Sequence, residues 1–437
     1  MHPLIAICIV LFAIGLAFGL MRLLTHRTPL SPELTRKGLH IALGLGCLSF
    51  PWLFDAFWPV LVLCGFTLVA FAWIRCQKGS WRSLLHGVTR TSWGELCFPI
   101  AVTILFGLMQ DPIVDYVVPL LVLTLADAIG ALVGVRYGQS KFTTDEGHKS
   151  LEGSAAFFIV AFLSTHLCLL LGTDIDRLDS VLIAVIIGIL VMLIEAIAWR
   201  GLDNLFIPLA TYLLVHTYME MELGQLLGRL GLLLGILLFF GLLSRRTYAK
   251  DSVLIASTLV LYLIWAVGGW LWALSPIIVA IVYCLLCPPR QQPLTTRHGL
   301  ADLAALAGAG LIWLFLSVAS GSDRFELAFI ASWGAQIAML FTAFLCAKLP
   351  SRSTVTVITA STLIALSALS LVLYLHFHQD HWIAATATVI LASGLASAAL
   401  WFLEWKQHGT TQQPGRPARQ FLYGSTASTL GLIQFLF

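Results

Sequence analysis

Charged residues are scarce in this sequence. Asp, Glu, Lys and Arg make up 11% of the 437 residues, whereas a soluble globular domain carries about 25%. Hydrophobic residues make up 59% of the chain, and the mean hydropathy is +0.91. This composition excludes an ordinary soluble domain. The net charge of +3 says little by itself, and we expect no nucleic-acid partner.

Several sequence patterns of known chemistry are also missing. The nine cysteines are scattered, and Cys284 and Cys287 form the only close pair. Without a second pair or a histidine pair at metal spacing, they read as small apolar side chains on helices. The G-x-x-x-x-G-K-[ST] spacing of a P-loop is not met around Lys149. The alternating pattern of an outer-membrane barrel is absent as well.

Long apolar runs are present from end to end. Runs of about 20 residues are long enough to cross a bilayer as helices, which satisfy their own backbone hydrogen bonds. We therefore predict an all-α, polytopic integral membrane protein with about 14–16 transmembrane helices. The sixteen candidate spans begin between His2 and Phe421. The first, Pro3 to Leu20, is followed by Arg22 and Arg27, which predicts an uncleaved helix with its N-terminus outside.

Basic residues alternate between the predicted loops. All lysines and arginines except Arg177, Arg229 and Arg324 fall on the side predicted to be cytoplasmic. We therefore expect a protein of the cell (inner) membrane. Polar residues are richer in the loops before about residue 245 than after it. This predicts a membrane domain at 1–245 that carries the chemistry, and a further transmembrane domain at 246–437.

One carboxylate lies well inside an apolar span. Asp127 in "LADAIGALVGVRYG" costs about 2.5–3.5 kcal/mol at such a place, so a cation, a partner side chain or water must offset it. Gly130, Gly134 and Gly138 follow it at intervals of four residues. Such spacing is typical of close helix packing, which is compatible with the approach of a nucleotide to the same glycines.

A polar segment, "TDEGHKSLEGS", precedes the next apolar run. Lys149, Ser150, Glu152, Gly153 and Ser154 lie where a helix is predicted to begin on the cytoplasmic side. Free amide groups at a helix N-terminus, with lysine and serine as donors and glycine for close approach, suit a polyphosphate. The alternative is a helix start capped by serine and glutamate with a lysine that extends to the surface.

Further oxygen ligands follow in "LIEAIAWRGLDNLFIP". Glu195 is a second carboxylate inside a span, Asp203 and Asn204 begin the next span, and Pro208 bends it. These residues near the inner leaflet suggest a Mg²⁺ site, because Mg²⁺ keeps waters and phosphates as ligands and needs few carboxylates. The alternative for Glu195 is a buried acid that fixes helix packing.

Two shorter stretches complete the candidate set. In "LTRKGLH", Arg36, Lys37 and His40 share one helical face at the membrane surface, and we expect Arg36 and Lys37 to bind the nucleotide. In "RTSWGE", Arg90 and Glu95 precede a short span. The alternatives are basic residues that flank a membrane span, and a local ion pair beside a glycine turn.

Together these stretches resemble the polyprenol, phytol and dolichol kinase group, which is related to the CDP-diacylglycerol synthases. The resemblance rests on "RKGLH", "RTSWGE", "LADAIGALVGVRYG", "KSLEGS" and "E-x7-DNLFIP" over about residues 30–220. It implies transfer of the γ-phosphoryl group of CTP to a membrane-embedded isoprenoid alcohol. It also implies that the nucleotide and Mg²⁺ are surrounded by Asp127, Lys149, Ser150, Glu152, Glu195, Asp203 and Asn204.

The resemblance leaves several assignments open. The general base is Glu152, Glu195 or His40, and the oligomeric state is unknown. The longer second motif of the cytidylyltransferases is missing, which favours a kinase over a phosphatidate cytidylyltransferase. A secondary transporter is the alternative from another class, since intramembrane acids also mark ion pathways.

The C-terminal half has a separate, degenerate resemblance. "ARQFLYGSTASTLGLIQFLF" and residues Leu300–Leu311 resemble the prenyl-phosphate kinase family. The nearest match to that family's acidic signature, "FTAFLCAKLP", lacks the acids. We therefore expect the C-terminal domain to be non-catalytic.

Overall fold

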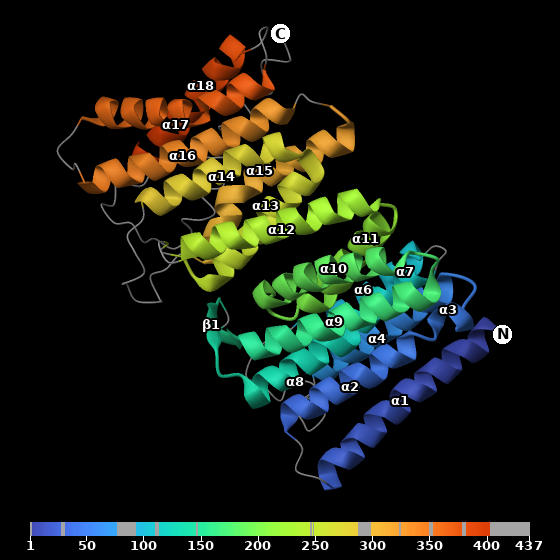
Figure 1. The fold of residues 1–437 in the computed structure, drawn as a ribbon. Coiled ribbons are helices and arrows are strands. Elements are labelled where there is room, and N and C mark those ends of the chain that lie inside the picture. The colour runs from blue at the N-terminus through green and yellow to red at the C-terminus, as the bar shows by residue number, and fades with distance from the viewer. Residues whose placement is uncertain are drawn as a thin grey trace. The chain divides into compact units, whose positions relative to one another are not determined.

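The computed structural model divides the chain into two compact units, Met1–Gly231 and Leu232–Phe437. It describes residues 2–27, 31–76, 93–109, 113–145, 147–244, 247, 249–286, 299–322, 325–348, 353–377 and 382–402. Both units consist almost entirely of helices (Figure 1). Along the chain, the boundary between the two units falls within helix α12, Leu223–Leu243. The division into a catalytic and a non-catalytic domain that the sequence predicts near residue 245 stays a prediction.

The first unit contains the helices that carry the candidate residues. They are α1 Pro3–Arg27, α2 Pro32–Cys47, α3 Phe50–Leu53, α4 Trp58–Cys76, α6 Gly94–Leu108, α7 Val114–Leu121, π-helix η1 Val122–Ala126, α8 Asp127–Tyr137, α9 Leu151–Gly172, α10 Arg177–Ile197 and α11 Asp203–Met219. A two-stranded hairpin, β1 Lys141–Thr144 and β2 Gly147–Ser150, joins α8 to α9.

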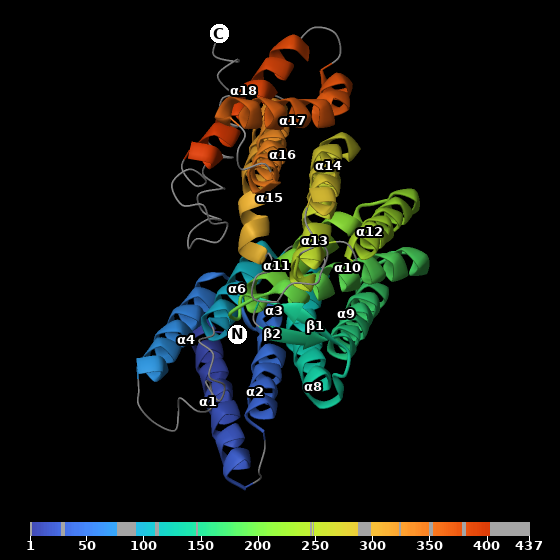
Figure 2. The same cartoon turned by 90° about the vertical axis from the view of Figure 1, so that its left-hand side faces the viewer.

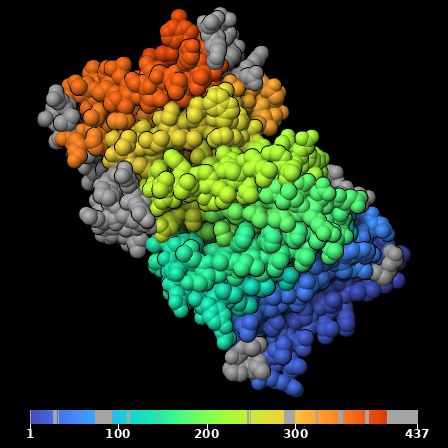
Figure 3. Space-filling view, in the orientation of Figure 1, coloured from blue at the N-terminus to red at the C-terminus, as the bar shows by residue number. Residues whose placement is uncertain are grey.

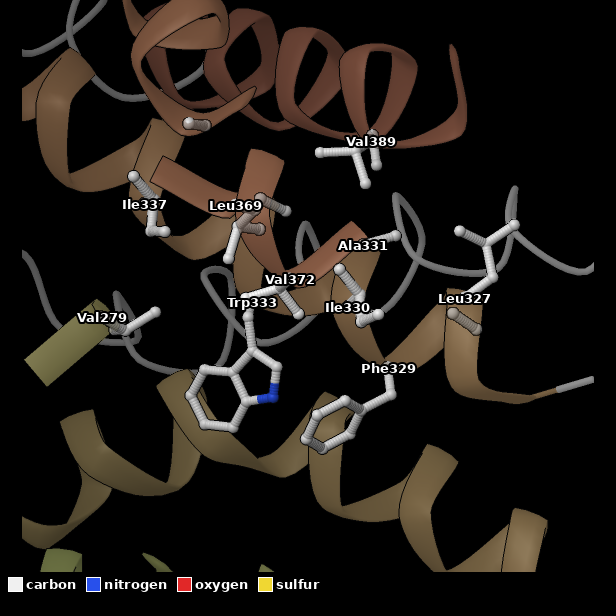
Figure 4. Packing of buried hydrophobic residues seen from close by; sticks show 14 of the residues in the cluster. Val279, Leu327, Phe329, Ile330, Ala331, Trp333, Ile337, Leu369, Val372 and Val389 are labelled. Carbon is white, nitrogen blue, oxygen red and sulfur yellow. The ribbon is translucent and has the colours of Figure 1, made fainter. Parts of the chain in front are cut away.

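The second unit is a bundle around one central helix. Its helices are α13 Asp251–Gly268, α14 Trp270–Leu286, α15 Leu300–Ser320, α16 Glu326–Lys348, α17 Thr354–His376 and α18 Trp382–Leu400. Helix α16 packs against α14, α15, α17 and α18, and the rings of Phe329 and Trp333 lie side by side in its core (Figure 4). No residue predicted to take part in the chemistry lies in this unit.

The polytopic all-α architecture predicted from the apolar runs is confirmed. Within the described residues, ten helices are long and apolar enough to cross a membrane, and three shorter helices are apolar. The ten are Pro3–Thr25, Val114–Tyr137, Leu151–Gly172, Arg177–Ile197, Leu223–Leu243, Asp251–Gly268, Leu300–Ser320, Glu326–Cys346, Thr354–His376 and Trp382–Leu400. The predicted last span, which begins near Phe421, lies outside the described residues, as does Arg90.

Neighbouring helices of the first unit are packed along their lengths. Helix α9 lies between α8 and α10 (Figures 1 and 3). Helix α11 packs against α10 and α6. Asp115 in α7 pairs with His216 in α11 at 3.1 Å between Oδ2 and Nδ1, which ties one end of this group together. Lys149, Glu195 and Asp203 lie towards the other end, where α9 and α11 begin and α10 ends. Asp127 is the first residue of α8 and lies near the middle of the span Val114–Tyr137.

Candidate active site

A buried ion pair forms the centre of the site. Lys37 Nζ lies 2.6 Å from Asp127 Oδ2, and the two side chains are 4% and 7% exposed. The pair supplies the partner that the cost of an intramembrane carboxylate requires. The sequence predicted that a cation, a partner side chain or water would offset this cost, without deciding among them. Lys37, 90 residues away, was expected as a nucleotide ligand.

Helix α2 presents Lys37 and His40 on one face. Ser31 caps the helix, with its Oγ accepting from the amide of Leu34 at 3.3 Å, and Pro32 occupies the first helical position. These signals fix where the helix begins. A spacing of three residues then places Lys37 and His40 next to each other towards α8.

A π-helical turn precedes Asp127 and holds His40. His40 Nε2 lies 3.0 Å from the backbone oxygen of Leu123, within η1, and 3.7 Å from Asp127 Oδ2. Gly44 lets α2 come close to this turn, because a Cβ there would overlap the side chain of Thr124. Turns of this kind are frequent at functional sites, and the sequence analysis did not predict this one.

The hairpin carries Lys149 to the site. Its strands pair antiparallel with Lys141 opposite Ser150, and Gly147 turns the chain at φ 128°, a conformation that favours glycine. The Glu152 carboxylate accepts from the amide of Ser140 at 2.9 and 3.3 Å and closes the base of the hairpin.

Ser150 begins helix α9. Its Oγ accepts from the amide of Gly153 at 3.2 Å, so the serine cap of the alternative interpretation is present. The other two parts of that interpretation are not, because Glu152 accepts from Ser140 and Lys149 pairs with Glu195. Ser154 is half-buried in the first turn of the helix. The structure therefore gives Ser150 and Glu152 local structural roles, and their roles in nucleotide binding and catalysis stay predictions.

Lys149 forms a second ion pair, which is more open than the first. Its Nζ lies 2.7 Å from Glu195 Oε1, and it also donates to the backbone oxygen of Glu195 in the last turn of α10. The side chains of Lys149 and Glu195 are 28% and 19% exposed. The Glu195 carboxylate also interacts electrostatically with Asp127 and Asp203. Residues predicted from three separate stretches are thus brought together.

Asp203 and Asn204 follow a loop in which two residues have a left-handed backbone conformation. Arg200 and Gly201 have φ values of 56° and 82°, so the chain turns sharply between α10 and α11. Asn204 Nδ2 donates to the backbone oxygen of Gly94 at 2.9 Å and ties α11 to α6. Asp203 lies at the N-terminus of α11, where a negative charge is favourable.

One carboxylate oxygen of the site is unsatisfied. Among the described residues, the buried Oδ1 of Asp203 has no hydrogen-bond partner. Asp203 interacts electrostatically with Asp127, Lys37 and Lys149. A buried acceptor without a donor is costly, so this atom marks a place where a cation or a hydrogen-bond donor would be stabilised.

The residues fit a Mg²⁺ ion only if the ion brings other ligands with it. No group of three or more His, Cys, Asp and Glu side chains in the described part of the chain is arranged to hold a metal. Asp127 is already paired with Lys37, which leaves Asp203 Oδ1 as the most available oxygen. Mg²⁺ commonly uses one or two carboxylates together with waters and substrate phosphates. It therefore stays a prediction that Mg²⁺ binds Asp127, Asp203 and Glu195 together with water and phosphate ligands.

The glycines of α8 lie in its contact with α9. A Cβ on Gly130 would lie 2.9 Å from Phe157 Cβ, and one on Gly134 would lie 3.2 Å from Ser150 Oγ. Gly138 faces Ser150 in the same way. These glycines therefore lie in a close helix contact, as one of the two interpretations of their spacing predicts. Nucleotide binding by Gly134, Gly138 and Gly153 stays a prediction.

Replacing Gly153 by alanine is expected to destabilise the protein by about 1–3 kcal/mol. The new Cβ would lie 2.9 Å from both Gly130 O and Gly134 Cα, and backbone atoms cannot rotate away. The measurement is the unfolding midpoint of the purified protein in detergent. Gly65→Ala is the control, because nothing lies within 4 Å of an added Cβ there. Equal midpoints for the two variants would contradict the packing role.

Arg36 is the candidate least engaged with the site. It pairs with Glu33, one turn earlier on α2, at 2.6 Å between Nη2 and Oε1, and its side chain is 43% exposed. It still interacts electrostatically with Asp127 and Asp203. Arg36 therefore contributes positive charge at the edge of the site.

Comparison with known proteins gives one informative match. The chain is 29% identical over 208 residues to a phytol kinase of Synechocystis sp., and the match covers 46% of this chain and 86% of the relative. The chain is similar to a phytol kinase. No family model matches the chain, and no solved structure matches it.

Proposed function

We propose that this protein is an integral membrane kinase that transfers the γ-phosphoryl group of CTP to the hydroxyl of an isoprenoid alcohol. The similarity to phytol kinase carries the proposal. The geometry supports it, because two lysines and three carboxylates lie close enough in the first unit to interact electrostatically. Phosphoryl transfer depends mainly on positioning and electrostatic stabilisation, which such a cluster supplies.

The proposed reaction forms one bond and breaks one. The alcohol oxygen bonds to the γ-phosphorus, the bond from that phosphorus to the β–γ bridging oxygen breaks, and CDP leaves with the bonding pair. The hydroxyl proton passes to a base on the protein. The products are the isoprenoid monophosphate and CDP.

His40 is the base that the geometry favours among the three candidates. Because the Leu123 carbonyl can only accept, the neighbouring Nε2 of His40 carries the hydrogen. In the neutral imidazole, Nδ1 then has a lone pair and can accept the proton. Glu195 is held by Lys149, and Glu152 holds the hairpin. Both carboxylates already accept hydrogen bonds, which makes them less available than His40 to accept the proton.

Lys149 is proposed to stabilise the charge on the transferring phosphoryl group. An ammonium group has three N–H donors, and Glu195 accepts two of them among the described residues. The third can bind a phosphate oxygen. The partial exposure of the pair leaves it accessible to a nucleotide.

Mg²⁺ would be held by Asp203 and Asp127, and when bound it would neutralise charge on the β- and γ-phosphates. The unsatisfied Oδ1 of Asp203 supports this assignment. The basic Arg36 and Lys149 at the same end of the helices support a site that faces the cytoplasm, where positive charge is enriched. The basic edge would also attract CTP.

One incubation tests the proposal. The purified protein, phytol and Mg²⁺ are incubated with CTP labelled either at the γ- or at the α-phosphate. We expect γ-label in the lipid and α-label in CDP. Pyrophosphate with α-label in the lipid would indicate a cytidylyltransferase instead. If no alcohol is phosphorylated and reconstituted vesicles show flux of an ion or lipid, the protein is a transporter.

A further inference from the structure

An apolar cavity of about 560 Å³ lies in the first unit beside the candidate site. Its walls come from α1, α2, α3, α4 and α6, and α1 lies next to both α2 and α4 (Figures 1 and 2). The volume is within the range of about 300–1,000 Å³ that is usual for ligand pockets.

The described walls offer a ligand almost no hydrogen bonds. Three of the lining residues carry hydroxyls, and each hydroxyl is bound within its own segment. Thr67 donates to Leu63 O at 2.7 Å, Thr103 to Pro99 O at 2.8 Å, and Ser49 to Gly46 O at 2.7 Å. The remaining wall is aliphatic, aromatic, glycine or cysteine. Such a wall suits a hydrocarbon chain and disfavours a polar ligand.

The cavity borders the candidate site at one aromatic side chain. Phe98 lines the cavity, and its ring meets the ring of His40 edge-on, with centroids 5.2 Å apart. Helix α2 also joins the two, because it carries His40 and, within the next two turns, the lining residues Leu43 and Gly46. The two regions are therefore close enough for one extended molecule to have its polar head near His40 and its tail in the cavity, on the other side of the Phe98 ring.

We infer that this cavity holds the hydrocarbon tail of the isoprenoid alcohol and selects its chain length. The inference rests on the proposed function, since it assigns a place to that substrate. It identifies α1, α2, α3, α4 and α6, which line the cavity, as the elements that determine which alcohols are accepted. A phospholipid acyl chain is the competing occupant.

Two glycines make the cavity testable without disturbing the packing. Gly15 on α1 and Gly46 on α2 line it, and no atom lies within 4 Å of a Cβ added at either position. A leucine at these positions would extend into empty space. Gly65 on α4 is equally open but does not line the cavity, which makes Gly65→Leu a matched control.

The experiment compares a short and a long substrate. Phosphorylation of geraniol and of phytol is measured for the wild type, Gly15→Leu, Gly46→Leu and Gly65→Leu. We expect the first two variants to lose about tenfold in kcat/KM for phytol relative to geraniol, because each methylene kept from apolar burial costs about fourfold in affinity. The Gly65→Leu variant should keep the wild-type ratio.

A second measurement separates this inference from the proposed function. A diazirine analogue of phytol is photo-crosslinked to the wild type and to Gly46→Leu, with excess phytol or excess dioleoylphosphatidylcholine as competitor. We expect labelling of α1 and α2 that phytol suppresses and Gly46→Leu reduces. If only the phospholipid competes, or if active Leu variants keep the wild-type substrate ratio, the inference is wrong. If labelling occurs without phosphorylation of any alcohol, the proposed function fails and the tail site stands. If Gly46→Leu does not fold, Gly46→Val replaces it.

Discussion

Replacement of Lys37 by methionine is expected to destabilise the protein by about 3–5 kcal/mol and to abolish phosphoryl transfer. The change leaves the Asp127 carboxylate buried, with its 2.6 Å ion-pair partner removed. An uncompensated charge of this kind is more costly than the loss of the pair as a whole. The measurement is equilibrium unfolding of the purified protein in detergent micelles, together with the CTP-dependent assay.

Two controls identify the cause. The double variant Lys37→Met/Asp127→Leu should recover most of the stability, because apolar residues of similar volume replace a buried pair at little cost, yet it should remain inactive. Arg36→Met removes a positive charge from the adjacent position, where the side chain is 43% exposed, and should cost less than about 1 kcal/mol. A double variant as unstable as Lys37→Met alone would show that the pair is not the origin of the effect.

Replacement of Lys149 by alanine is expected to lower kcat by about 10²–10³-fold with little change in stability. The Lys149–Glu195 pair is partly exposed, so water can replace the lost contact, whereas in the proposed reaction the transferring phosphoryl group loses a charged donor. Steady-state kinetics with CTP and phytol, at saturating concentrations of both, gives kcat.

The matched control lies in the same hairpin. Lys141 is exposed on β1, directly opposite Ser150, and Lys141→Ala should leave kcat unchanged. Lys149→Arg keeps the charge and should retain part of the activity. A fall in kcat of the same size for Lys141→Ala and Lys149→Ala would mean that the hairpin, and not the ammonium group of Lys149, is required.

The sequence indicated the architecture and the polar residues because both follow from the cost of placing groups in a bilayer. Apolar runs of sufficient length predict helices, and an acid within such a run predicts a partner. That argument applies to Asp127 without naming Lys37, because the two residues are 90 positions apart. Only the packing of α2 against η1 and α8 decides which cation reaches the carboxylate.

The local geometry of the site was less accessible from the sequence. The strands β1 and β2 have four residues each, too few for an alternating pattern to be recognised. The spacing of the glycines in α8 is compatible both with helix packing and with the approach of a ligand. Only the position of α9 in the structure shows that these glycines lie in a helix contact. The apolar cavity left no signal either, since its lining resembles any lipid-facing surface.

The π-helical turn at residues 122–126 also sets the rotation about the helix axis between the side chains before it and those after it. Each residue in an α-helix advances the chain by about 100°, so deleting one residue from this segment would rotate everything after it by that angle. Asp115, which precedes the turn, would keep its contact with His216. Asp127 would swing away from Lys37, and the two ends of one membrane-crossing helix would no longer match their neighbours at the same time.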